Sequence, residues 1–357
     1  MLEGDSAACC GPVRSVTIKD VAREADVSIA SVSRVLNGVG RVGQATRSRI
    51  LDTAERLSYV PHEGARSLIT RRTSTIGMIL PDLHGEFFSE LLRGADGAAR
   101  ARGLHLLVST SHGSVAEAAA AIRSMRGRVD GLIVMSPQLA PEPLTPPPAV
   151  PTILINAHPA EGQAGVTVQN YEGAVAMVRH LAETGARRIA HIAGPQENGD
   201  AADRRRGYCD SRPLDLGADF TVAGDFTAAS GYAAGLKLGR LDPLPDAVFA
   251  ANDMMAAGCM EAFADLGLRV PDDIKVGGFD DVPLARFLRP ALTTMRIDLA
   301  ALGAKAFEQL AAAIEAPGGA PRIEQILPEL MVRDSCGHRS GRDTTNQNMT
   351  KPGRYPE

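Results

Sequence analysis

The stretch VTIKDVAREADVSIASVSRVLNG, from Val16 to Gly38, decides how the first sixty residues fold. Its apolar residues recur at helical spacing in two short runs, Ile18, Val21, Ala22 and Ala25, then Val32, Val35 and Leu36. Thr17 and Ser28 stand where the two helices begin, and both residue types cap helix N-termini. The stretch therefore predicts a helix, a tight turn and a second helix.

The second predicted helix carries small and hydrogen-bonding side chains around a thin apolar seam. Such a lean surface suits a helix that enters the major groove: Ile29 and Ala30 can touch thymine methyl groups. Ser33, Arg34 and Asn37 supply hydrogen-bonding groups beside them. A third helix from Thr46 is expected to close a small core with Ile50, Leu51, Ala54 and Leu57. These features predict a helix-turn-helix DNA-binding head, and the alternative is a surface helix of a small bundle.

The charge is distributed unevenly along the chain. The formal net charge is -4, yet residues 14–72 contain eleven Lys and Arg against six Asp and Glu, a local excess of +5. Residues 1–13 and 73–357 carry the compensating acid. A small basic head on a larger acidic body is typical of a nucleic-acid-binding domain fused to another domain.

Length and composition bound the remaining possibilities. A chain of 357 residues with 44% apolar residues is expected to form two or three globular domains. No apolar run is long enough to cross a membrane and the first fifteen residues lack a secretory signal, so a cytoplasmic protein is expected. Five cysteines without C-x-x-C spacing indicate reduced thiols, and the eight histidines show no metal-binding motif. Neither a metal nor a cofactor is predicted.

From Ser74 onward, short apolar runs alternate with amphipathic helical segments. The predicted strands are TIGMILP, HLLVSTS, GLIVMSP, TILIN, RIAHIAG, AVFAAND and KVGGFD. Continuous apolar strands separated by helices indicate an α/β fold of doubly wound parallel sheets, and about 260 residues of this pattern suggest two lobes. Ligands of such folds bind outside the carboxyl ends of the strands. The proline-rich stretch Pro137–Pro151 is expected to be a stiff surface loop, and the alternative is a docking segment for another domain.

The opening stretch, followed by TRSRI and YVPHEGARSL, resembles the DNA-binding head of the lactose-repressor/galactose-repressor (LacI/GalR) family of bacterial transcription regulators. The resemblance continues at STIGMILPD, FFSELLRG, ANDMMAAG, VGGFDD, LTTMRID and VRDS, and covers residues 16–335. It implies a body like a periplasmic sugar-binding protein, with an effector cleft between two lobes. The expected parts are a disordered extension 1–15, the head 16–60, a hinge helix and linker 61–73, the body 74–335 and a disordered tail 336–357. One lobe is placed at 74–156 with a return near 283–294, and the other at 157–282 and 295–335.

In that family, the segment matching Pro61–Leu68 forms a hinge helix on operator DNA, and the leucine at Leu68 wedges into the minor groove. Relatives pair mainly through the body, including the helix matching Glu86–Arg102, so a homodimer on a pseudo-palindromic operator is predicted. The residues expected to contact DNA are Thr17, Ser28, Ile29, Ala30, Ser31, Ser33, Arg34, Asn37, Arg41, Thr46, His62, Ala65 and Leu68.

Three polar residues of the body match the family's effector contacts: Asn252, Asp280 and Arg204. The first two follow predicted strands, and together an amide, a carboxylate and a guanidinium suit the hydroxyls of a sugar. The alternatives are that Asn252 and Asp280 cap helices and that Arg204 is a solvated charge. Further candidates are Asp82, Phe87, Phe88, Asn156 and Phe226, and for the phenylalanines a purely core role is equally open.

The leading hypothesis is a ligand-controlled transcription regulator, most simply a repressor of carbohydrate-utilisation genes with a small sugar-like effector. A corepressor-dependent regulator with a purine-like ligand is the alternative within this class. A soluble sugar-binding protein of transport type comes next, although the basic head argues against it. An enzyme is not predicted, because the sequence contains no G-x-S-x-G, no Walker A lysine motif and no dinucleotide fingerprint in its proper context.

Overall fold

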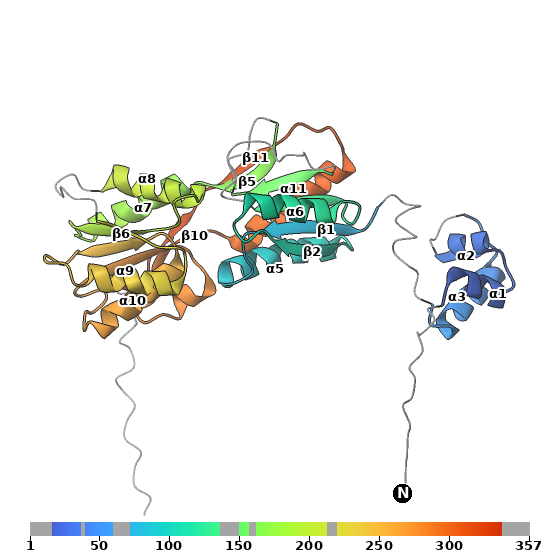
Figure 1. Cartoon of the computed structure of the whole chain (residues 1–357), viewed down its shortest axis with the longest axis horizontal. Coiled ribbons are helices and arrows are strands. Elements are labelled where there is room, and N and C mark those ends of the chain that lie inside the picture. The colour runs from blue at the N-terminus through green and yellow to red at the C-terminus, as the bar shows by residue number, and fades with distance from the viewer. Residues whose placement is uncertain are drawn as a thin grey trace, which may run out of the picture. The chain divides into compact units, whose positions relative to one another are not determined.

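The computed structural model describes residues 16–36, 40–59, 72–135, 150–156, 162–212 and 220–337 (Figure 1). The chain divides into two units, Met1–Thr73 and Ser74–Glu357, here called the head and the body. The expected extension 1–15, most of the hinge and nearly all of the tail lie outside the described residues. So do four predicted DNA contacts, which are Asn37, His62, Ala65 and Leu68.

The head consists of three helices, α1 (Ile18–Glu24), α2 (Ile29–Leu36) and α3 (Gln44–Arg56). The predicted caps are present. The Asp20 carboxylate accepts hydrogen bonds from the backbone N and the Oγ1 of Thr17, at 3.0 and 2.7 Å. Ser28 Oγ accepts from the backbone N of Ser31 at 3.1 Å. These bonds satisfy backbone and side-chain donors where α1 and α2 begin.

The core of the head is formed by one apolar face from each helix, with Val21, Val32, Val35 and Ile50 fully or almost fully buried. The prediction for Leu51 is wrong, because its side chain is 44% exposed. Ile50 already occupies the inward position of α3, and the next residue of a helix points about 100° away. Three short helices around seven buried residues give a small, self-contained unit.

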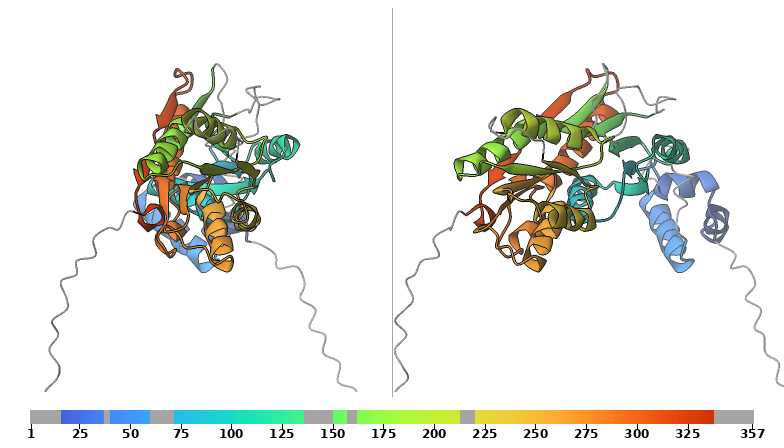
Figure 2. Two further views of the ribbon diagram at one scale, coloured as in Figure 1. Left: turned by 90° about the vertical axis from the view of Figure 1, so that its left-hand side faces the viewer. Right: turned by 60° about the vertical axis from the view of Figure 1, so that its left-hand side comes forward.

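The body is built from two six-stranded sheets with helices on their faces, as Figures 1 and 2 show. The strand order of the first sheet is β11-β5-β4-β3-β1-β2 and that of the second is β12-β10-β9-β8-β6-β7. The first lobe contains β1 (Thr75–Leu80), α5 (Glu86–Ala101), β2 (His105–Thr110), α6 (Val115–Met125), β3 (Gly131–Met135), β4 (Thr152–Ile155), β5 (Ala164–Val168), α11 (Leu299–Glu315) and β11 (Ile323–Ile326). The second contains α7 (Asn170–Glu183), β6 (Ile189–Ala193), α8 (Gly199–Ser211), β7 (Thr221–Ala223), α9 (Ala228–Leu238), β8 (Ala247–Ala250), α10 (Asp253–Asp265), β9 (Lys275–Asp280), η1 (Pro283–Arg286), β10 (Thr293–Arg296), β12 (Glu329–Met331) and η2 (Asp334–Cys336).

The division between the lobes differs from the prediction. Strand β5 pairs with β4 and β11 pairs with β5, so both strands belong to the first lobe. Helix α11 packs against α5 in the same lobe, so closely that a Cβ added at Gly303 would lie 2.2 Å from the carbonyl O of Leu91. The first lobe therefore takes 74–168 and 297–326 rather than 74–156 with a return at 283–294. The predicted return is wrong because β10 pairs with β9, in the second sheet.

The carboxyl ends of the two sheets face each other. The chain leaves the first lobe at the carboxyl end of β5, which runs parallel to β4, and enters α7 of the second lobe. It returns at the carboxyl end of β10, which runs parallel to β9, and enters α11. A direct hydrogen bond joins these edges, since the backbone N of Leu284 donates to Glu86 Oε2 at 2.7 Å. The residues that follow the parallel strands therefore meet between the lobes, where such folds bind ligands.

Candidate functional site

The outer face of α2 is open to solvent, as a DNA-reading helix requires. Among the residues predicted to contact DNA, Thr17, Ser28, Ile29, Ala30, Arg34 and Arg41 are exposed, and Ser31, Ser33 and Thr46 are half-buried. Ile29 exposes 45% of its surface although Val32 and Val35 of the same helix are buried. An exposed isoleucine beside polar side chains is suited to apolar contact with a base edge.

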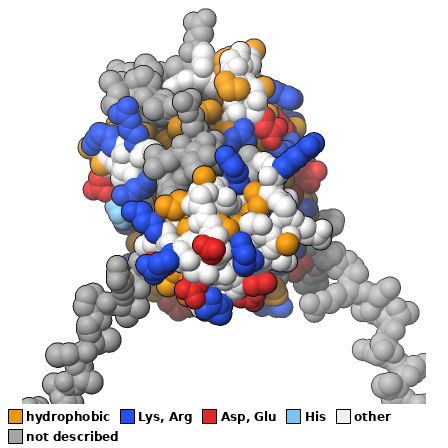
Figure 3. Space-filling model, turned by 90° about the vertical axis from the view of Figure 1, so that its right-hand side faces the viewer, with side chains coloured by type: hydrophobic (Ala, Val, Ile, Leu, Met, Phe, Trp, Pro, Cys, Tyr) orange, Lys and Arg blue, Asp and Glu red, His pale blue; other side chains and the backbone are white. Residues whose placement is uncertain are grey.

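The charges of the chain are interspersed on the face drawn in Figure 3. Lys and Arg side chains (blue) lie among Asp and Glu side chains (red) there and do not form one continuous patch. In the head, some of the basic side chains are already paired: Arg23 contacts Asp20 at 2.7 Å and Arg56 contacts Glu24 at 3.1 Å. Exposed pairs of this kind are weak, so these arginines can exchange their partner for a DNA phosphate at little cost.

Arg204 is the buried centre of the site in the second lobe, with only 3% of its surface exposed. Its Nε donates to Asn170 Oδ1 at 2.8 Å and its Nη1 donates to the carbonyl O of Ala251. Its Nη2 lies 3.2 Å from Asp280 Oδ1, and the guanidinium carbon lies 3.8 Å from the centroid of the Phe279 ring. The alternative of a solvated charge is therefore wrong, because protein groups surround this guanidinium.

Asp280 ends β9 with 4% of its surface exposed and a left-handed backbone, φ 107°. Burial raises the pKa of its carboxyl group to about 6, whereas Arg204 lowers it and the charge of Asp200 raises it further. Among the described residues, Oδ1 has no hydrogen-bond partner, although it lies within ion-pair distance of Arg204. The alternative that Asp280 caps a helix is not observed, since the N-cap of η1 is Val282.

Asn252 caps a helix, which is the alternative role that the sequence left open for it. Its Oδ1 accepts from the backbone N of Met255 at 2.9 Å, at the start of α10. Its Nδ2 donates to the carbonyl O of Phe226 at 3.0 Å, so the same side chain also fixes the segment after β7. The Phe226 ring lies against Gly194, where an added Cβ would meet Phe226 Cζ at 2.5 Å. Both side chains thus stand at the carboxyl edge of the second sheet.

The first lobe contributes a second group of predicted residues. Asp82 Oδ1 accepts from the backbone N of Leu83 and of His84, and contacts His84 Nδ1 at 2.9 Å. This side-chain contact lowers the pKa of Asp82. Phe87 and Phe88 pack edge to face, with ring centroids 5.2 Å apart, and are half-buried against the core. Packing of both rings against the core is therefore observed, whereas their role in lining the effector cleft stays a prediction.

Asn156 is the residue of the first lobe with unmet hydrogen-bonding capacity. It follows β4 with a left-handed backbone, φ 48°, and 4% of its surface exposed. Both Oδ1 and Nδ2 are buried, and neither has a hydrogen-bond partner among the described residues. A buried amide without partners costs stability. A polar ligand in the cleft would satisfy it.

The sequence interpretation missed two residues that hold this site together. Asn170 donates to Asp200 Oδ1 at 2.8 Å while it accepts from Arg204, which links α7 to α8. Asp253 accepts from the backbone N of Val282 at 2.9 Å and from a threonine hydroxyl of β10. Burial raises the pKa of Asp253 well above its usual range. The position of Asn170 directly after a parallel strand was the available signal, but β5 itself was not predicted.

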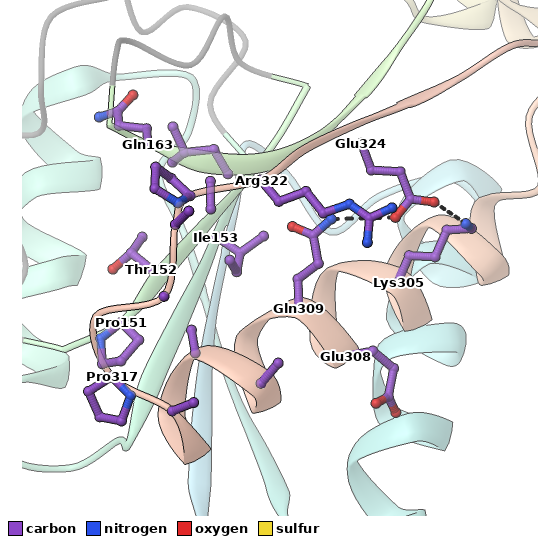
Figure 4. Close-up of a pocket in the computed structure, with 18 of the residues that line it drawn as sticks. Pro151, Thr152, Ile153, Gln163, Lys305, Glu308, Gln309, Pro317, Arg322 and Glu324 are labelled. Carbon is purple, nitrogen blue, oxygen red and sulfur yellow. Dashed lines mark hydrogen bonds and ion pairs between the residues drawn. The ribbon is translucent and has the colours of Figure 1, made fainter.

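A cavity of about 1190 Å³ lies away from these residues, between the outer face of α11 and strands β4, β5 and β11 (Figure 4). Lys305, Gln309, Arg322 and Glu324 border it, and Lys305 and Gln309 contact the Glu324 carboxylate. None of the predicted effector residues lines this cavity. It is therefore separate from the facing edges of the sheets.

Two absences apply to the part of the chain that the structure describes. There, no group of three or more His, Cys, Asp or Glu residues is arranged to hold a metal ion. No described helix has the length and apolar character needed to cross a membrane.

A three-helix head with an open second helix, joined to a two-lobed α/β body with polar residues between the lobes, defines the class of ligand-responsive DNA-binding regulators. The comparisons with known proteins agree. The family of bacterial regulatory proteins named after LacI matches residues 17–62, and a periplasmic binding protein-like domain matches residues 178–336. The chain belongs to the LacI family of bacterial transcription regulators.

Relatives and solved structures extend the similarity over most of the chain. Catabolite control protein A of Priestia megaterium is 36% identical over 305 residues, which are 83% of this chain and 92% of that protein. The transcriptional repressor PurR of Vibrio vulnificus is 33% identical, covering 89% of this chain and 98% of its own length. A Lac repressor dimer bound to operator and an anti-inducer has a TM-score of 0.80 at 26% identity, and a CelR–cellobiose complex has 0.67 at 30%; each comparison covers 90% of this chain and 99% of the other. These relatives are named as regulators of transcription or catabolite control.

Proposed function

We propose that this chain is a transcriptional repressor that binds a pseudo-palindromic operator as a homodimer and is controlled by a small sugar-like effector bound between the lobes. The observation that carries the proposal is one chain with an open DNA-reading helix and a second, separate polar site. Exposed Ile29 and Arg34 support the first role. Binding to chromosomal DNA also requires a cytoplasmic location.

The effector site rests on groups from both lobes. Asp280 and Asn156 each present buried polar atoms without hydrogen-bond partners among the described residues, at the facing edges of the sheets. Arg204 orients Asp280, and Asn252 orients the segment of Phe226. A polyhydroxyl compound supplies donors for a carboxylate and both donors and acceptors for an amide. The similar CelR structure is a complex with cellobiose, which supports a sugar as the class of ligand.

The homodimer is supported by exposed apolar side chains on the body. Strand β2 is an edge strand that exposes Leu107 and Val108, and Phe287 after η1 is 73% exposed. Apolar edge strands favour pairing with another chain. The Lac repressor structure is a dimer on its operator, and a two-fold dimer doubles the surface of one small head.

A corepressor of purine type is the second candidate, because PurR proteins are among the relatives. One experiment separates the two. Operator fragments are first selected from random DNA with the full-length chain, and affinity is then measured by fluorescence anisotropy at fixed salt, with and without sugars or purine bases. Release by a sugar supports an inducer, and tighter binding with a purine base supports a corepressor. If the chain fails to select any DNA sequence, the proposed function is overturned.

A further inference from the structure

We infer that the effector of this chain carries no negative charge: it is a neutral or amino-bearing polyhydroxyl compound, not a sugar phosphate, sugar acid or nucleotide. The inference rests on the proposed function and narrows the ligand class of the same site. It follows from the contacts that the cationic side chains and helix N-termini at the facing edges of the sheets already make with groups of the protein.

The guanidinium of Arg204 is not available to an anion. Its Nε and Nη1 donate to Asn170 and Ala251, and its Nη2 faces Asp280. One side of its plane lies against the Phe279 ring. An arginine that binds a phosphate or carboxylate presents two parallel donors to it. Here those donors serve protein oxygens instead.

Two arginines beyond Asp280, Arg296 and Arg333, are committed in the same way. Asp281 has a fully buried side chain that contacts Arg296 Nε at 2.7 Å and Arg333 Nη2 at 2.5 Å. Arg286 lies 3.6 Å from the same carboxylate. Arg333 also donates to the carbonyl O of Leu292. Arg296 and Arg333 compensate the buried charge of Asp281, and an anionic ligand would have to compete with that carboxylate for them; the exposed Arg286 is held less closely.

Helix N-termini are the other common anion sites, and three of those at the facing edges already hold acidic side chains, whereas α9 has none in its first turn. The first turns of α8, α10 and α5 contain Asp200, Asp253 and Glu86. Asn198 caps α8 by accepting from Ala201 N at 2.9 Å. At the N-termini of α8, α10 and α5, a ligand anion would therefore meet a carboxylate. A helix N-terminus without an acidic side chain would attract a phosphate instead.

The groups that do remain for a ligand are acceptors and an amide. Both polar atoms of Asn156 are buried without hydrogen-bond partners among the described residues, and Asp280 Oδ1 has only the ion-pair contact with Arg204 Nη2 at 3.2 Å. Asp200 lies one turn before Arg204 on α8 and adds a second carboxylate to this edge. Hydroxyl and ammonium groups donate to such acceptors, whereas a phosphate is repelled by them.

The test uses the full-length chain and matched sets of probes. Binding is measured by calorimetry and by thermal shift for glucose, glucosamine and glucose 6-phosphate, for galactose, galactosamine and galacturonate, and for ribose and ribose 5-phosphate. Within every set that binds, the anionic member is expected to bind about tenfold more weakly or not at all. Asp200→Asn is expected to reduce the difference in affinity between the anionic member and the other members of a set. Asp203→Asn, which removes an exposed pair with Arg206 on the same helix, is the matched control and leaves it unchanged.

The outcomes separate the inference from the function on which it rests. An anionic member that binds as tightly as its neutral counterpart, or more tightly, overturns the inference and leaves a sugar-controlled repressor intact. The absence of binding by every member contradicts a monosaccharide effector, and the same comparison between cellobiose and cellobionate then decides the inference. The comparison of neutral and anionic probes with the wild-type chain decides the inference by itself. A poorly folded Asp200→Asn protein therefore does not weaken the test.

Discussion

Asp280 is expected to cost the protein stability at neutral pH, and Asp280→Asn should therefore stabilise the body while it removes the effector response. Burial raises the pKa of this carboxyl group from 3.8 to about 6 in spite of Arg204. A difference of this size corresponds to about 3 kcal/mol between the charged and neutral forms. Asparagine has the shape of the neutral form and does not titrate, so the variant avoids this cost.

The sign of the effect defines the assay. Between pH 3.8 and about 6 the folded state binds more protons than the unfolded state, so this group's contribution to stability falls as pH rises through that window and is constant above it. The free energy of unfolding of Asp280→Asn minus that of the wild type should therefore rise by about 3 kcal/mol between pH 3.5 and pH 7.5. Urea unfolding is followed by far-UV circular dichroism, since the chain contains no tryptophan.

Asp273→Asn is the matched control, with the opposite sign. A hydrogen bond from the exposed Arg269 lowers the pKa of Asp273 to about 2, so its contribution to stability is present above pH 3.8 and is lost as pH falls toward 2. That variant should lose a little stability at neutral pH. A difference curve for Asp280→Asn that stays flat from pH 3.5 to pH 7.5 would refute the reasoning that Asp280 is held as a strained, buried acid for its ligand.

Three other variants test the head, the body and the hinge. Arg34→Ala should weaken operator binding strongly at fixed salt with unchanged circular dichroism, whereas Arg23→Ala on α1 should weaken it much less; equal effects would contradict the docking of α2. Gly303→Val should lower the free energy of unfolding by about 1–3 kcal/mol, because its Cβ would lie 2.2 Å from a backbone oxygen of α5, whereas Gly97→Ala, with nothing within 4 Å, should raise it slightly. Leu68→Ala, outside the described residues, is expected to reduce operator affinity and DNA bending more than affinity for random DNA, and equal losses would show that Leu68 is not a wedge.

The sequence predicted the elements whose pattern is local. The head helices follow from caps and apolar spacing within a few residues, and strands such as β1, β3 and β8 are continuous apolar runs because both of their faces are buried. Strands β5, β11 and β12 escaped prediction for the opposite reason. Their residues AGVTV, IEQI and ELM are short, partly polar or broken by Gly165. The boundary of the first lobe depends on β11, which pairs with β5 across more than a hundred residues, and no local pattern contains that pairing.

The candidates predicted to lie at or just after strand ends do so, and these are Asp82, Asn156, Asn252 and Asp280, but the surroundings of the predicted residues were not predictable. Arg204 was predicted as an effector contact with a solvated charge as the alternative, and it is buried because Asn170 and Ala251, 34 and 47 residues away, supply its acceptors. Asn252 is determined more locally, because it caps the helix that starts with the next residue. Residues whose role depends on their own turn can be identified from sequence, whereas those that depend on crossover topology need the structure.

The coupling between effector and operator follows from which segments cross the facing edges. Strand β1 begins at Thr75, immediately after the head unit ends at Thr73, and leads directly to α5. In its first turn, Glu86 accepts from the backbone N of Leu284, four residues beyond Asp280. The proposed ligand, held by Asp280 and Asn156, is expected to change how the two edges approach each other and thereby to act on the element that is continuous with the linker to the head. The effector can then change operator affinity only by as much as its own affinity differs between the two arrangements of the lobes. Its contacts at this edge therefore set the largest change in operator affinity that it can produce.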